Sequence, residues 1–114
     1  MWQVATVEIF DAWFLSLSGD QQKSILAGIF KLQEFGPQLA RPYADTLHFP
    51  GSIHRMKELR IQHRGHPFRF FFAFDPQRQA VLLCGGDKTG DKRFCQRLLP
   101  IAAREFSHYL ATQR

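Results

Sequence analysis

The sequence predicts a single α+β domain. Its 114 residues are 45% hydrophobic, which is enough for one core, and the chain is too short for two domains of ordinary size. Helical spacing of apolar residues in the first third gives way to the period of two that is typical of strands, and helical spacing returns near the end. The twelve phenylalanines supply large apolar groups for the core of such a layered arrangement.

The first third of the chain predicts one strand and one helix. β-Branched and aromatic residues alternate roughly in the opening MWQVATVEIF, which indicates a strand. A helix follows, because apolar residues recur three and four positions apart between the polar stretch SGDQQ and Gly36-Pro37. Ser18 or Asp20 can cap its start, and Gly36-Pro37 ends it. Residues 37–52 contain three prolines and are expected to form a loop.

Three strands of an antiparallel meander are predicted after this loop. Their sequences are IHRMKELRIQH, HPFRFFFAF and QAVLLCG, separated by two turns. On the second strand, one face is expected to be the core because it carries four phenylalanines, Phe68, Phe70, Phe72 and Phe74. Arg69, Phe71 and Ala73 point to the other face, which is expected to be open. If the first turn centres on Gly65, Arg60 lies opposite Arg69 on that face.

A basic, glycine-rich segment, GGDKTGDKRF, joins the third strand to a last helix. Apolar residues keep helical spacing from Phe94 to Leu110, Asp91 can cap the start, and Pro100 implies a kink or a restart. The segment lacks the spacing of a nucleotide-binding P-loop. Its glycines either make the turn or let backbone amides and the Lys88 ammonium meet one phosphate, and Lys88 is the stronger candidate.

The distribution of charge favours a polyanionic partner. Residues 1–50 carry three Lys and Arg against five Asp and Glu, whereas residues 51–114 carry twelve against five. Such a basic half suits RNA or DNA, and it also suits an acidic protein. No apolar run reaches the roughly 18 residues of a membrane helix, and the start does not read as a signal peptide, so a cytoplasmic protein is expected.

Neither a metal nor a cofactor is predicted. The five histidines lack the spacing of a zinc site, and the two cysteines, Cys84 and Cys95, lack the paired spacing of a zinc ribbon or a redox motif. Both cysteines are interpreted as reduced packing residues. A chemistry that relies on protein side chains alone is therefore expected.

The opposed arginines are the most informative local feature. Like charges opposite each other on neighbouring strands are unfavourable unless an anion lies between them. Glu58 or a phosphate could be that anion, and two solvated arginines are an equal possibility. Cutting RNA without a metal requires a base for the 2′-hydroxyl, a proton donor and cations around the phosphate. The predicted catalytic set is Glu58, Arg60, Arg69 and Lys88.

Further residues are candidates for binding RNA. The predicted contacts are Lys57, Arg64, His66, Phe71, Lys92 and Arg93. Phe71 or Tyr43 could stack on a base. Glu58 has two possible roles, as the catalytic base or as an ion-pair partner that holds Arg60 in place.

Five segments occur together and in a fixed order along the chain: RPYADTL, MKELRIQ, PFRFFFAF, LLCGGDKTGDKRF and PIAAREF. In this combination the chain resembles toxins of the RelE/ParE superfamily, in its phage-derived HigB-like branch. The resemblance covers roughly residues 20–110 and implies a RelE-like fold, with an N-terminal strand and helices packed on a twisted antiparallel sheet and a C-terminal helix. For RelE and HigB members it implies mRNA cleavage on the ribosome, and a helix-turn-helix, HigA-like antitoxin as partner. The resemblance implies that the cations which such toxins carry on their strands correspond to Lys57, Arg60 and Arg69. The cation that precedes the last helix corresponds to Lys88 or Lys92.

One stretch departs from the family pattern. Similar toxins often place a tyrosine or histidine near the start of the last helix, where this chain has Arg93-Phe94-Cys95. Phe94 can stack on a base and cannot donate a proton. The leading hypothesis is therefore a metal-independent mRNA endoribonuclease that inhibits translation, with a ParE-like inhibitor of DNA gyrase and a basic protein-binding module as alternatives.

Overall fold

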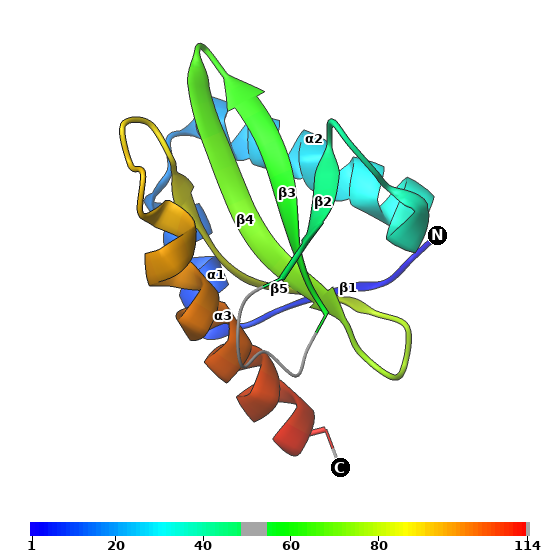
Figure 1. The fold of residues 1–114 in the computed structure, drawn as a ribbon. Coiled ribbons are helices and arrows are strands. Elements are labelled where there is room, and N and C mark those ends of the chain that lie inside the picture. The colour runs from blue at the N-terminus through cyan, green and yellow to red at the C-terminus, as the bar shows by residue number, and fades with distance from the viewer. Residues whose placement is uncertain (49–54, 114) are drawn as a thin grey trace.

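The computed structural model describes residues 1–48 and 55–113 and shows a five-stranded sheet between two helical layers (Figure 1). The strands are β1 Val4–Thr6, β2 Ala44–Leu47, β3 Met56–His63, β4 His66–Phe74 and β5 Ala80–Asp87. The helices are α1 Glu8–Ser16, α2 Gly19–Phe35 and α3 Phe94–Ala111, with a short 3-10 turn at Gly36–Gln38. The predicted α+β class is confirmed. No helix within the described residues is long and apolar enough to cross a membrane.

The sheet has the strand order β1-β5-β4-β3-β2. The meander of β3, β4 and β5 is antiparallel, as the period of two predicts. β1 instead lies parallel to β5, with Val4 opposite Ala80, so the prediction of a purely antiparallel sheet is corrected to a mixed one. Parallel neighbours require a long connection, and the chain between β1 and β5 supplies it through α1, α2 and three strands.

The N-terminal strand is shorter than predicted, and a helix follows it at once. β1 ends at Thr6 and α1 begins at Glu8, within the ten residues that were expected to be a strand. α1 has only nine residues and no side-chain cap, so its signal in the sequence is weak. Its Phe10 is buried, with its ring centroid 5.4 Å from that of Phe70. Packing of this kind holds a short helix that local propensity alone does not specify.

α2 confirms the predicted helix. Ser18, one of the two proposed caps, accepts a hydrogen bond from the Gln21 N–H at 3.2 Å, and the Gln21 side chain accepts one from the Ser18 N–H at 2.9 Å. This reciprocal pair is a capping box. The helix ends at Gly36, whose φ of 57° favours glycine.

β2 lies within the segment that was expected to be a loop. Residues Ala44–Leu47 pair with β3 and place Asp45 opposite Glu58. Four residues are too few to show a period of two, and the surrounding prolines dominate the composition. The first two residues of the strand predicted from residue 53 lie outside the described residues, and β3 begins at Met56.

Both faces of the sheet are covered, which corrects the expectation of an open face. α1 and α2 pack on the predicted core face, which carries Phe68, Phe70 and Phe72. α3 packs on the other face, where the ring of Phe71 lies 5.8 Å from that of Phe94. Phe71 is fully buried and therefore cannot stack on a base in this structure. The amphipathic last helix needs an apolar surface, and the second face of the sheet provides it.

α3 is one helix, so the restart considered at Pro100 does not occur. Pro100 is exposed, and the helical hydrogen bond that it lacks is lost on the solvent side. The residue before the helix is Arg93, which makes no side-chain cap, so Asp91 is not the cap residue. Asp91 instead accepts a hydrogen bond from the Arg93 N–H at 3.1 Å and pairs with Arg97 at 2.8 Å.

Candidate functional site

The hairpin of β3 and β4 places the predicted arginine pair. Arg64 and Gly65 form a two-residue turn with φ values of 50° and 82°, and His63 pairs with His66 across it. Positive φ at both positions is the geometry of a type I′ turn, which fixes the register of the two strands. Arg60 consequently lies opposite Arg69, as the turn at Gly65 predicts.

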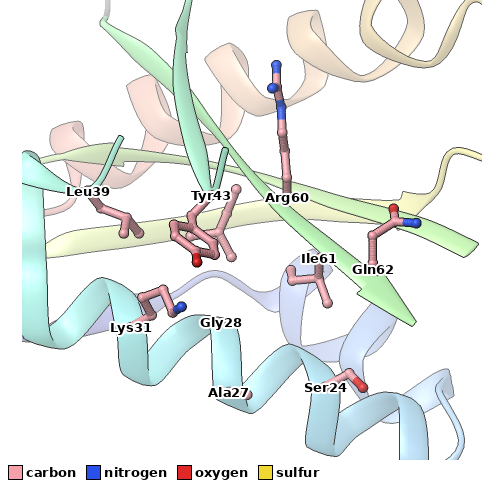
Figure 2. Close-up of a pocket in the computed structure, with 10 residues that line it drawn as sticks. Ser24, Ala27, Gly28, Lys31, Leu39, Tyr43, Arg60, Ile61 and Gln62 are labelled. Atoms are coloured by element: carbon pink, nitrogen blue, oxygen red, sulfur yellow. The ribbon is translucent and has the colours of Figure 1, made fainter. Parts of the chain in front are cut away.

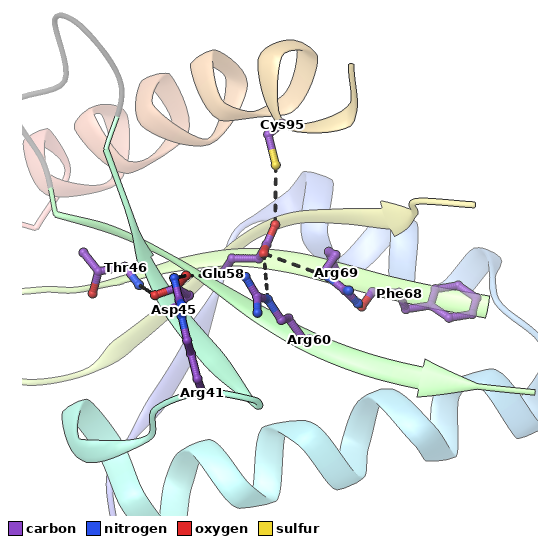
Figure 3. A network of polar contacts seen from close by, with 8 residues as sticks. All are labelled: Arg41, Asp45, Thr46, Glu58, Arg60, Phe68, Arg69 and Cys95. Carbon is purple, nitrogen blue, oxygen red and sulfur yellow. Dashed lines mark hydrogen bonds and ion pairs between the residues drawn. The ribbon is translucent and has the colours of Figure 1, made fainter. Parts of the chain in front are cut away.

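A single carboxylate, that of Glu58, lies between the two arginines (Figure 3). Its Oε1 accepts a hydrogen bond from Arg60 Nε at 3.2 Å and lies 3.9 Å from Arg69 Nε. Glu58 is only 2% exposed, so this pairing occurs where water screens charge weakly. The protein therefore supplies one of the two anions that the sequence suggested between the opposed guanidinium groups.

Arg69 is the less satisfied of the two arginines. Its Nη1 donates to the Phe68 carbonyl at 2.9 Å, whereas its Nε is buried and has no hydrogen-bond partner among the described residues. Its side chain is 16% exposed, against 33% for Arg60. Burial lowers the pKa of Arg69, the Glu58 charge favours the protonated form, and the Arg60 charge opposes it. An added anion would therefore relieve an unfavourable environment.

Asp45 extends the cluster and was not predicted from the sequence. Its Oδ2 accepts from Arg60 Nη2 at 3.4 Å and from Arg41 Nη2 at 2.8 Å. The hydrogen bond from Arg41 holds the pKa of Asp45 below its usual value. The contact depends on the pairing of β2 with β3. The prolines around β2 hide this strand in the sequence, so the contact could not be predicted.

Cys95 also contacts Glu58, although the sequence suggested only a packing residue. Its thiol points at Glu58 Oε2, with Sγ at 3.5 Å (Figure 3). Burial and then the Glu58 charge raise the pKa of Cys95, so the thiol keeps its proton at neutral pH. Cys84 is a buried packing residue, as predicted.

Lys88 lies at the edge of this cluster. Its charge favours the thiolate of Cys95, so it acts on the same thiol that contacts Glu58. Its backbone N–H donates to the Pro67 carbonyl at 2.8 Å and ties the loop to the start of β4. Direct contacts thus join Glu58, Arg60, Arg69 and Cys95, whereas Lys88 is linked to them only through the effect of its charge on the Cys95 thiol. We call these five residues the arginine cluster.

Gly85 and Gly86 do not make the turn before the last helix. Both belong to β5, which continues to Asp87. A Cβ on Gly85 would lie 2.6 Å from a ring carbon of Trp13, and one on Gly86 would lie 3.0 Å from a ring carbon of Phe94. The two glycines therefore let aromatic rings of α1 and α3 approach the sheet closely.

The other predicted RNA contacts are dispersed. Arg64, at the hairpin tip, pairs with Asp20 at 2.8 Å. His66 Nδ1 lies 3.2 Å from Asp87 Oδ2 and 3.1 Å from Thr89 Oγ1. His66 therefore lies beside the loop that carries Lys88, whereas Arg64 is tied to the first turn of α2.

Three different surfaces carry the remaining candidates, which are Lys57, Lys92, Arg93 and Tyr43. Lys57 lines a separate cavity near the end of α3, and desolvation lowers its pKa. Lys92 and Arg93 are exposed just before α3. Tyr43 is 46% exposed, with Lys31 Nζ 3.7 Å from its ring centroid. Within the part of the chain that is described, no group of three or more His, Cys, Asp and Glu side chains could hold a metal ion.

Comparisons with known proteins agree with the family suggested by the sequence. The model of the family described as "Phage derived protein Gp49-like" matches residues 12–107. A Mycobacterium tuberculosis protein named "Putative toxin HigB3" is 41% identical over 104 residues, which cover 90% of this chain and 89% of that protein. Another from the same organism, "Putative toxin HigB2", is 43% identical over 88 residues, which cover 75% of this chain and 43% of that longer protein.

No solved structure matches the chain significantly. The family match nevertheless spans both helical layers and the whole sheet apart from β1. The chain therefore belongs to the phage-derived Gp49-like family, within the HigB-like branch of the RelE/ParE superfamily that its sequence resembles.

Proposed function

We propose that this chain is the toxin of a bacterial toxin-antitoxin system and that it cleaves mRNA on the ribosome without a metal ion. The names of its two relatives support the first part. The observation that carries the second part is the opposed pair of Arg60 and Arg69, held by the buried Glu58 and flanked by Lys88.

Electrostatic stabilisation is the chemistry that this cluster is suited to perform. Attack by a 2′-hydroxyl carries the phosphate through a state with additional negative charge on its oxygens. Arg69 and Arg60 would bind these oxygens, and Lys88 would add a third cation. Donors that are already fixed in place need not reorganise during the reaction, which is the condition under which such stabilisation is effective.

Glu58 is better suited to positioning the arginines than to acting as the base. A base must come within hydrogen-bond reach of the 2′-hydroxyl. The Glu58 carboxylate is 2% exposed, and its two oxygens are engaged by Arg60 and Cys95. Of the two roles that the sequence left open, this burial favours the ion-pair partner.

The test combines growth and cleavage. Induced expression of the chain in a bacterium is expected to arrest growth and translation, and to create new 5′ ends in mRNA. The purified protein, treated with EDTA and freed of it by gel filtration, should still cut a reporter mRNA in a translation extract. Arg69→Met should lose this cleavage, while Arg104→Met, an exposed arginine of α3, should retain it. Normal growth, or cleavage abolished by the chelator treatment, would count against the proposal.

A second candidate, the gyrase inhibitor, is favoured by one observation. Phe94 is only 1% exposed and packs on Phe71, so the first turn of α3 offers neither a stacking surface nor the usual proton donor. Inhibition of DNA supercoiling by the purified chain, with intact mRNA in the extract, would select this function.

A further inference from the structure

A groove lies between α2 and β3, on the side of the sheet away from the arginine cluster (Figure 2). It encloses about 240 Å³. Leu59 and Ile61 of β3 form an apolar wall, Gly28 of α2 lies against that wall, and the exposed Ala27 borders the groove beside Gly28. The guanidinium of Arg60 points away from α2, so only the base of that residue borders the groove. The groove is therefore a surface separate from the proposed RNA site.

The outer edge of β3 is left unpaired at Gln62, where β3 borders this groove. β2 pairs with β3 only as far as Leu59, whereas β3 continues to His63. Since His63 pairs with His66 across a two-residue turn, the odd-numbered residues of β3 exchange hydrogen bonds with β4. The even-numbered residues face the other edge, as the bond from the Arg60 N–H to the Tyr43 carbonyl shows. The backbone N–H and carbonyl of Gln62 therefore point into the groove, where no described strand meets them.

The rim of the groove selects for negative charge. Lys31 borders it, with its Nζ 3.7 Å above the Tyr43 ring, and the residues that line it include no Asp or Glu. On the solvent side of α2, Leu26 and Phe30 are 39% and 60% exposed and extend the apolar surface. An occupant should therefore combine a free backbone edge, an apolar side chain and a carboxylate.

We propose that this groove binds an extended segment of a partner protein, which adds a short strand to β3 at Gln62. Its apolar side chain lies between Ala27 and Ile61, and its carboxylate contacts Lys31. A peptide fits these groups because its backbone offers alternating N–H and carbonyl groups to a sheet edge, which RNA cannot do. The antitoxin is the partner expected to carry the segment, and this identity alone rests on the proposed function.

A titration with synthetic peptides tests the groove directly. The full chain is titrated, with NMR detection of its amides, by a nine-residue peptide that alternates valine with glutamate and by one that alternates valine with lysine. The glutamate peptide is expected to shift the amides of Gln62 and Ala27 and to bind at least about fivefold more tightly, because one desolvated charge contact changes from attraction to repulsion.

Four variants locate the contact. Gln62→Pro removes the outward N–H without removing a bond to β4, and Ala27→Trp fills the groove at an exposed helix position, so both are expected to abolish binding. Lys31→Glu should weaken binding about fivefold or more. Lys23→Glu makes the same charge change on α2 at an exposed position outside the groove and should bind normally. A thermal midpoint near that of the parent shows that each variant is folded.

Several results would overturn the inference. They are the absence of saturable shifts at millimolar peptide, shifts confined to another surface, equal binding of both peptides, or equal weakening by the two lysine variants. An RNA oligonucleotide that competes for the Gln62 and Ala27 amides would assign the groove to RNA instead. Binding of the glutamate peptide by a chain that is not toxic would refute the proposed function and leave the groove intact, whereas a toxic chain without peptide binding would refute the groove alone.

Discussion

Replacing Arg69 by methionine separates the charge of this residue from its packing. The side chain is 16% exposed, so its aliphatic stem is buried and methionine can fill much of the same volume. Alanine would also remove that stem, at a cost of about 1–2 kcal/mol of apolar burial. The open sheet face expected from the sequence would have made alanine harmless, and the covered face makes methionine the sharper test.

The expected change in stability is small because the terms oppose each other. Loss of the 2.9 Å hydrogen bond to the Phe68 carbonyl costs about 1 kcal/mol. The variant also loses the attraction of Arg69 to Glu58, whereas relief of desolvation and of repulsion by Arg60, the influences that lower the pKa of Arg69, acts in the opposite direction. The thermal midpoint should therefore stay within about 5 °C of the parent. Loss of a charge that stabilises the reacting phosphate should cost about 2–4 kcal/mol, or about 10²–10³ in cleavage rate.

Two measurements on the same preparation decide the matter. The thermal midpoint is followed by circular dichroism, and the cleavage rate is measured on a reporter mRNA in a translation extract. A methionine variant that cuts as fast as the parent would refute the phosphate-binding role of Arg69. A variant whose midpoint falls far more than about 5 °C would show that the charge is needed for folding, and the energy balance above would be wrong.

The remaining predictions concern three side chains that are buried or half-buried, Glu58, Cys84 and Tyr109. Glu58→Gln should destabilise the protein by about 2–4 kcal/mol in urea unfolding, because two partly buried guanidinium groups lose their shared anion; an unchanged midpoint would contradict this. Burial raises the pKa of Cys84 to about 12, so the thiol stays protonated below that pH. Iodoacetamide at pH 8 should therefore label Cys84 only after unfolding, which mass spectrometry can detect. Tyr109→Phe removes the 3.3 Å hydrogen bond to Asp75 and should cost about 1 kcal/mol. Burial and then Asp75 raise the pKa of Tyr109, so parent stability should fall as pH rises above the ordinary tyrosine pKa, and the Phe variant should fall less.

Features set by short stretches of chain were predictable from the sequence. The capping box at Ser18 and the two-residue turn at Gly65 each depend on a few adjacent residues, and the turn carries with it the opposition of Arg60 and Arg69. Glu58 follows from the same strand register. These residues could be named because a period of two and a turn type are enough to place them.

Features set by distant contacts were not predictable in this way. Asp45 reaches Arg60 only because β2 pairs with β3, and Cys95 reaches Glu58 only because α3 docks on the second face of the sheet. The same docking buries Phe71, which the alternation of side chains had placed on an open surface. Alternation divides residues between two faces and does not indicate which face another element will cover.

The parallel pairing of β1 with β5 has a consequence for how the chain acquires its fold. Val4 pairs with Ala80 across two thirds of the sequence, so a chain made from its N-terminus holds β1 without a partner strand until β5 has been synthesised. Closing so long a connection loses entropy before any contact compensates for it, which makes this pairing a candidate for the slow step of folding. α3 follows β5 and completes the arginine cluster with Cys95. The order of elements along the chain thus delays the assembled cluster until synthesis is nearly complete.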